Sequence, residues 1–147
     1  MKIQKGKVTT VLGLLKRVRS QMTSERTAWC AGSLVQRART KAGNPSPTKV
    51  SACLMGHIAI AENPEHFLKL TDIDDLQYPE TPLGRRAALE LARTHAPDSF
   101  NGVGEDGGAY DYLLAQDRMT SFNDGTSKKR VLGLVDRTIN RLRRKRK

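Results

Sequence analysis

Apolar residues recur at a helical spacing near the beginning of the chain and again near its end. The first stretch predicts an amphipathic helix over roughly 9–23, with Thr9 or Thr10 as its N-cap. The last stretch predicts a helix that begins after Thr126 or Ser127 and continues into the basic end of the chain. Each of these helices has one apolar side that needs a protein core against which to pack.

One short motif occurs in both of these stretches. VLGLLKR at 11–17 and VLGLVDR at 131–137 share five of their seven residues. A structural repeat needs a longer match at a fixed period of about 20–50 residues. We therefore expect two helices that meet the same packing demand, side by side, with Gly13 and Gly133 at points where another helix approaches closely.

Between these stretches, the pattern predicts further helices separated by loops. We interpret TAWCAGSLVQRA as a helix that leads into a loop at KAGNPSPTK. VSACLMGHIAIAEN is apolar nearly all round and is typical of a buried helix with Ser51 as its cap, although a short apolar run also fits a buried strand. Thr81 and Pro82 begin a helix through LGRRAALELARTH.

Three other segments carry weaker patterns. We expect irregular structure for NPEHFLKLTDIDDLQYPETP and an acidic, glycine-rich surface loop for SFNGVGEDGGAYDY. YDYLLAQDRMTSF fits a short helix, a strand, or one followed by the other. The whole pattern predicts a mainly α-helical fold: a compact single-domain bundle over 1–147 with short irregular or strand segments, a basic N-terminal segment at 1–8 and a basic helix end at 141–147.

Charge is unevenly distributed along the chain, whose net charge is +11. Residues 1–60 contain eleven Lys and Arg against one acidic residue, and residues 61–126 contain five against thirteen. Residues 127–147 contain ten against one. Two basic ends around an acidic middle suggest a polyanionic partner, docking of the basic end on the acidic middle, or both.

The last predicted helix places four arginines on one side. At about 100° per residue, Arg137, Arg141 and Arg144 fall within about 40° of Arg130, and the apolar residues cluster about 130° away. The planar guanidinium can bond two phosphate oxygens. Like charges along this helix repel one another, so a bound anion would stabilise its end. A helix end that is merely solvated is the alternative interpretation.

This pattern favours nucleic acid, or another polyanion, bound through its backbone charge with little sequence preference. Aromatic residues make up 5% of the chain and lack the spacing of a base-stacking surface. If about eight cations contact phosphates, log K should fall against log salt with a slope of roughly −7. The predicted contact residues are Arg130, Arg137, Arg141, Arg143, Arg144, Lys145, Arg146 and Lys147 near the end, and Lys16, Arg17 and Arg19 in the first helix.

Cys53 and His57 are the first candidates for catalysis. Four residues apart on a helix, they lie on one side, and a thiol at a helix N-terminus beside a histidine can act as a nucleophile. Their apolar surroundings equally predict a buried, inert cysteine. Asp124 is a further candidate, although in Phe122-Asn123-Asp124-Gly125 it fits the role of organising a turn. We therefore expect a non-enzymatic protein rather than an enzyme.

The sequence indicates neither a metal site nor a cofactor. Its three histidines and two cysteines are scattered apart from the Cys53 and His57 pair. The acidic run TDIDDLQYPE lacks the glycine that a calcium loop requires. Unpaired cysteines and the absence of a signal peptide or a membrane-spanning apolar run predict a cytoplasmic protein.

Three short motifs resemble a known family. Trp29 with Gly32, Cys53-Leu54-Met55-Gly56, and Phe122-Asn123-Asp124 ahead of a helix are similar to domain of unknown function 6197, which occurs in bacteria and their phages. The resemblance spans roughly residues 8–142. It implies a compact, mostly helical domain and a phage or mobile-element origin, and it brings no established activity.

Three functions therefore stand as hypotheses. The first is a non-enzymatic accessory protein that binds nucleic acid, in the host cytoplasm if it is phage-encoded. The second is a phage or mobile-element effector that binds and inhibits a host or defence protein. The third is a cysteine hydrolase that uses Cys53.

Overall fold

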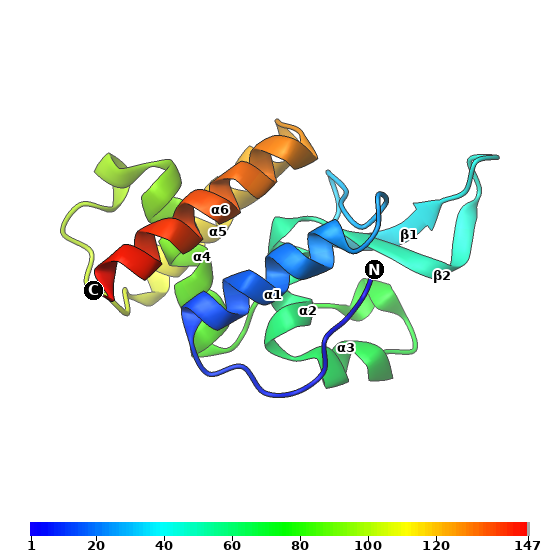
Figure 1. Cartoon of the computed structure of the whole chain (residues 1–147), viewed down its shortest axis with the longest axis horizontal. Coiled ribbons are helices and arrows are strands. Elements are labelled where there is room, and N and C mark those ends of the chain that lie inside the picture. The colour runs from blue at the N-terminus through cyan, green and yellow to red at the C-terminus, as the bar shows by residue number, and fades with distance from the viewer. Residues whose placement is uncertain (147) are drawn as a thin grey trace.

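The structure, a computed structural model, describes residues 1–146 and confirms the mainly α-helical fold (Figure 1). Six α-helices, two short 3-10 helices and one two-stranded antiparallel sheet account for the regular structure of these residues. The elements are α1 (Val11–Thr23), β1 (Val35–Arg39), β2 (Pro45–Ala52), α2 (Leu54–Glu62), α3 (Pro64–Lys69), η1 (Ile73–Asp75), α4 (Pro82–His95), η2 (Pro97–Phe100), α5 (Ala109–Asp124) and α6 (Lys128–Lys145).

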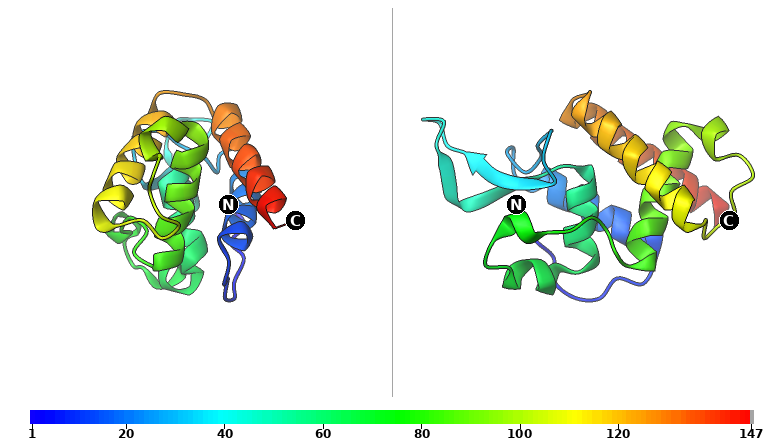
Figure 2. Two further views of the ribbon diagram at one scale, coloured as in Figure 1. Left: turned by 90° about the vertical axis from the view of Figure 1, so that its left-hand side faces the viewer. Right: turned by 180° about the vertical axis from the view of Figure 1, so that it is seen from behind.

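One large apolar core joins α1, α2, α4, α5 and α6. Helix α4 lies at its centre and packs against the other four, with Leu89 and Leu91 fully buried. Figure 2 shows α1 and α6 together on one side of the molecule and α4 with α5 on the other. A smaller apolar cluster lies between the sheet and the segment from α2 to η1.

The two helices that carry the VLGL motif pack against each other, as their sequences suggested. Helix α1 begins where Thr10 Oγ1 accepts a hydrogen bond from Gly13 N, and α6 begins where Ser127 Oγ accepts one from Arg130 N. The expectation for the glycines is wrong. A Cβ at Gly13 would meet Thr10 and Val8, and one at Gly133 would meet the side chain of Arg137. No neighbouring helix therefore approaches either glycine closely.

The predicted helix over TAWCAGSLVQRA is also wrong, because this segment pairs with β2. Cys30 N donates to Ala52 O, and Ala52 N donates to Ala28 O, which satisfies backbone groups that a helix would have used. Gly32, with φ +81°, then turns the chain into β1. Only the first half of the predicted loop KAGNPSPTK is a turn, and its second half belongs to β2.

Helix α2 begins two residues later than predicted, since Ser51 and Ala52 remain in β2 and Cys53 is the N-cap. At Gly56, an added Cβ would lie 1.9 Å from Leu34 O, so the close approach of these two segments requires glycine. The segment from 63 to 81, predicted as irregular, contains α3 and η1. The segment YDYLLAQDRMTSF, for which helix and strand both fitted, is helical throughout as part of α5.

Candidate nucleic-acid interface

Three of the four predicted arginines form an exposed row along α6. Arg130, Arg137 and Arg144 are spaced seven residues apart, which places them on one side of the helix. All three are exposed, and none makes an ion pair within residues 1–146. Over 14 residues at about 1.5 Å each, this arginine row extends about 21 Å. It is a linear array of uncommitted positive charge.

Arg141, the fourth predicted member, turns away from this row toward α4. Its guanidinium lies 2.5 Å from Glu90 Oε2 and donates to Glu90 O at 2.9 Å and to Thr94 Oγ1 at 3.1 Å. Glu90 also pairs with Arg93 at 2.6 Å. Burial would raise the pKa of Glu90, but hydrogen bonds and charge from Arg141 and Arg93 outweigh it and lower this pKa. Arg141 therefore joins α6 to α4 rather than facing a ligand.

A groove of about 420 Å³ lies between α1 and α6, on a different side of α6 from the arginine row. Lys16 and Arg143 are exposed at its edges, and neither makes an ion pair within the described chain. Arg19 pairs with Asp136 across the groove at 2.5 Å, so its charge is already matched. The lining residues are Lys16, Arg19, Ser20, Thr23, Asp136, Ile139, Asn140 and Arg143. We call the arginine row together with Lys16 and Arg143 the basic face.

The remaining predicted contact residues lie elsewhere. Arg17 is buried, with 9% of its surface exposed, and donates to Gly6 O at 2.8 Å and to Ala61 O at 3.3 Å. It therefore anchors the N-terminal segment and does not reach the basic face. Lys145 and Arg146 line a separate cleft at the end of α6. Lys147 is outside the described residues.

Sequence reasoning missed a second basic surface on the β1–β2 hairpin, which extends away from the helices (Figure 1). Arg37, Arg39, Lys41 and Lys49 are all exposed there. A signal was present, because no Asp or Glu occurs between Glu25 and Glu62. On one side, Arg37 and Arg39 share a shallow hollow with the carboxylates of Asp72 and Asp74.

The catalytic candidates Cys53 and His57 belong to the core. Cys53 is 4% exposed, its Sγ accepts a hydrogen bond from Gly56 N, and burial raises its pKa. His57 Nε2 donates to Ala28 O at 2.8 Å, and Gln21 Nε2 donates to His57 Nδ1 at 3.2 Å. Both ring nitrogens are thus engaged away from the thiol, and burial lowers the pKa of His57 to about 4. The arrangement gives a buried thiol that is protonated and has no base to activate it.

Asn123 connects three separate parts of the chain. Its Oδ1 accepts hydrogen bonds from Trp29 Nε1 at 2.7 Å and from Leu54 N at 3.0 Å, and its Nδ2 donates to Cys30 O at 3.0 Å. Beside it, Asp124 Oδ1 accepts from Gly32 N at 2.8 Å. These contacts fix the end of α5, and hence the start of α6.

The three motifs noted in the sequence therefore meet at one place in the structure. The model of the family of unknown function DUF6197 matches residues 6–141. The chain belongs to this family. No curated protein and no solved structure matches it.

The DUF6197 motifs of this chain perform structural tasks that the contacts make plain. Trp29 and Asn123 hydrogen-bond to each other, Cys53 caps α2, and Gly56 admits the carbonyl of Leu34. Asp124, a catalytic candidate from sequence, holds the backbone at Gly32. The motifs thus stabilise the junction between α5, α2 and residues 28–34, while the basic face lies on other residues.

Two further properties describe residues 1–146 of this DUF6197 chain. None of their helices combines the length and apolar character needed to cross a membrane. No group of three or more His, Cys, Asp or Glu side chains among them is placed to hold a metal ion.

Proposed function

We propose that this DUF6197 protein binds nucleic acid through phosphate contacts along the basic face. The observation that carries the proposal is the arginine row, Arg130, Arg137 and Arg144, which is exposed and without ion pairs within the described residues. Its length of about 21 Å equals the axial rise of about six nucleotides on one strand of duplex DNA. Lys16 and Arg143 add two uncommitted cations in the groove between α1 and α6.

The chemistry of these residues favours backbone contact over base recognition. A guanidinium can bond two oxygens of one phosphate, and its charge does not titrate in the physiological range. The groove residues beside the row include no aromatic side chain on which a base could stack. Binding with little sequence preference follows from contacts of this kind.

A salt titration tests the proposal. Five phosphate contacts predict that log K for duplex DNA falls against log salt with a slope of roughly −4.5. This slope is smaller than the sequence alone suggested, because Arg141 is engaged with Glu90 and because Lys145 and Arg146 line a separate cleft. The measurement is fluorescence anisotropy of a labelled 20-base-pair duplex from low to moderate salt. No binding at low salt, or a slope near zero, would overturn the proposal.

Two triple variants test whether the phosphate contacts lie on the arginine row. Replacing the arginine row with glutamine (R130Q, R137Q and R144Q together) should reduce the slope by about 2.7. The control removes three exposed cations from α3, α4 and α5 (K69Q, R85Q and R118Q together). Equal loss of affinity in both triple variants would show a response to net charge rather than to the basic face.

A protein partner is the second candidate function, and an apolar groove on the far side favours it. This groove of about 300 Å³ lies between α4, α5 and residues 77–80, and Arg85 Cζ lies 5.9 Å from the centre of the Tyr112 ring at its edge. Nearby, Tyr110 is 75% exposed and Leu113 is 64% exposed. Apolar side chains in such a position are typical of protein contacts.

The variant Y110S with L113S tests the second candidate. In a pull-down from nuclease-treated lysate, an effector should retain one partner that this variant loses and that the triple arginine variant keeps. A partner that is captured equally by all three proteins would argue against binding at this groove.

A further inference from the structure

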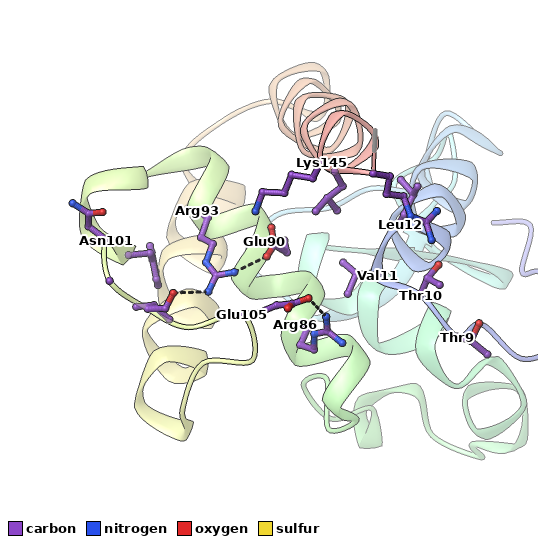
Figure 3. Close-up of a pocket in the computed structure, with 15 residues that line it drawn as sticks. Thr9, Thr10, Val11, Leu12, Arg86, Glu90, Arg93, Asn101, Glu105 and Lys145 are labelled. Carbon is purple, nitrogen blue, oxygen red and sulfur yellow. Dashed lines mark hydrogen bonds and ion pairs between the residues drawn. The ribbon is translucent and has the colours of Figure 1, made fainter.

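A cleft separate from the basic face lies at the C-terminal end of α6. It is bounded by the start of α1, the middle of α4, the loop after η2, and the last turn of α6 (Figure 3). Its volume is about 740 Å³, within the range of about 300–1,000 Å³ that is typical of small-molecule sites. The cleft is separate from the groove between α1 and α6, which different residues line.

The carboxylates that face this cleft are already matched by arginines. Glu90 lies 2.6 Å from Arg93 and 2.5 Å from Arg141. Glu105 lies 2.9 Å from Arg86, whose Nε is also 3.4 Å from Asp106. Figure 3 shows the pairs of Glu90 with Arg93 and of Glu105 with Arg86 along one wall of the cleft. An incoming anion would therefore meet few uncompensated negative charges.

Two cations in the cleft are uncommitted. Lys145 and Arg146 have no carboxylate within 4 Å among residues 1–146, and Figure 3 shows Lys145 extending across the opening toward Glu90 and Arg93. The first turn of α1, on the facing side, contains no acidic residue, and Thr9, which precedes the N-cap Thr10, is exposed. The cleft thus has an excess of positive charge at its rim.

Apolar side chains form part of the remaining lining. Val11, Val103 and Leu142 are half-buried, and the buried side chains of Leu12 and Phe100 lie behind them. An apolar wall beside two cations suits a ligand that combines a ring with an anionic group, because the ring can leave water while the anion is paired. Inorganic phosphate would use only the cations and would leave the apolar wall exposed.

We propose that this cleft binds a phosphate monoester attached to a ring, such as a nucleoside monophosphate, with Lys145 and Arg146 at the phosphate. The ligand is either a free nucleotide or the phosphorylated end of a nucleic-acid strand. The second source rests on the proposed function, since the strand would continue along the basic face, whereas the first does not.

Calorimetric titration of the full-length protein with AMP, adenosine and inorganic phosphate tests the site. AMP should bind at least tenfold more tightly than either fragment, and K145Q with R146Q should weaken AMP binding at least tenfold. The matched control, K16Q with R143Q, removes two exposed cations from the groove between α1 and α6 and should leave AMP binding unchanged. Absence of AMP binding, or AMP binding that survives in K145Q with R146Q, would overturn the proposal.

Oligonucleotides that carry a 5′-phosphate or a 5′-hydroxyl then distinguish the two sources. A preference of threefold or more for the phosphorylated strand, lost in K145Q with R146Q, identifies the strand end as the ligand. Equal binding of both strands, with AMP still bound, identifies the free nucleotide. The duplex salt slope separates this test from that of the proposed function, because a slope near zero with AMP binding intact would refute the basic face and retain the cleft.

Discussion

The two sides of this molecule are built from similar helices but carry opposite charge. The side formed by α1 and α6 presents the basic face, whereas the side formed by α4 and α5 presents the exposed carboxylates of Glu80, Glu105, Asp106 and Asp117. Each of α4 and α6 has one side in the same core. What differs is the charge that each outer surface presents.

This separation arises because the two ends of the chain lie side by side. Packing of α1 against α6 places two basic segments together, while the acidic middle of the chain forms α4, α5 and their loops. Within residues 1–146, α6 makes only two ion pairs, Arg141 with Glu90 and Asp136 with Arg19. Most of the positive charge of α6 is therefore free to interact with a ligand.

The largest expected effect comes from removing the hydrogen-bonded junction at the end of α5. Asn123→Ala would leave Trp29 Nε1, Leu54 N and Cys30 O without their partner at the end of α5. Unsatisfied buried groups of this kind should lower the free energy of unfolding by about 3–5 kcal/mol. Urea denaturation followed by circular dichroism measures the loss. A change below about 1 kcal/mol would show that these hydrogen bonds do not stabilise the junction at the end of α5.

Lowering the pH should reduce the free energy of unfolding, because His57 in the shared core becomes protonated, whereas the arginines of the basic face keep their charge. Burial lowers the pKa of His57 to about 4, against an ordinary value of about 6.5 in the unfolded chain. A depressed pKa means that this contribution to stability is complete above about pH 6.5 and is lost as the pH falls toward 4. Linkage predicts a loss of about 3 kcal/mol over that interval, of which about 2 kcal/mol falls between about pH 6.5 and 5.

The variant His57→Gln isolates this titration, because glutamine keeps an amide donor for Ala28 O but does not titrate. Its unfolding free energy should vary less between pH 6.5 and 5 than that of the unaltered protein. Carboxylates titrate mainly below this window, so they do not obscure the comparison. An unchanged pH dependence in the variant would contradict a buried, neutral His57.

The smallest and most selective effect compares two arginines of α6. Arg141→Gln should cost about 1–3 kcal/mol of stability, since it breaks charged hydrogen bonds to Glu90, and should leave the salt slope of duplex binding unchanged. Arg137→Gln should change stability by less than about 0.5 kcal/mol and reduce the slope by about 0.9. Urea denaturation measures the unfolding free energy, and fluorescence anisotropy measures the salt slope of duplex binding. If the two variants changed both quantities equally, Arg141 would not differ in role from the arginine row.

Local patterns determined much of the helical structure. The spacing of apolar residues and the caps Thr10, Ser127 and Thr81 predicted α1, α6 and α4 closely, because helix periodicity and capping depend on neighbours within one turn. For residues 27–38, the local pattern predicted a helix that the structure does not contain. Their backbone groups pair with β2, a segment that the local pattern had assigned in part to a loop.

The candidate site was only partly predictable for a related reason. Helical geometry placed four arginines on one side of α6, but it could not show that Glu90 of α4 would face Arg141. Helical geometry also could not show that the Arg17 guanidinium would donate hydrogen bonds to the backbone carbonyls of Gly6 and Ala61. Cavities such as the cleft beside Lys145 are formed by elements distant in sequence, and no local pattern describes them.

The sequence by itself determined the helices, their caps, the uneven distribution of charge and the family to which the chain belongs. These properties depend on residue order and on interactions across a few residues. Only the tertiary structure decided which cations remain free, which thiol and imidazole are buried, and where a cleft opens. The reason is that ion pairing and burial depend on how neighbouring helices are rotated and packed, and that packing involves the whole core at once.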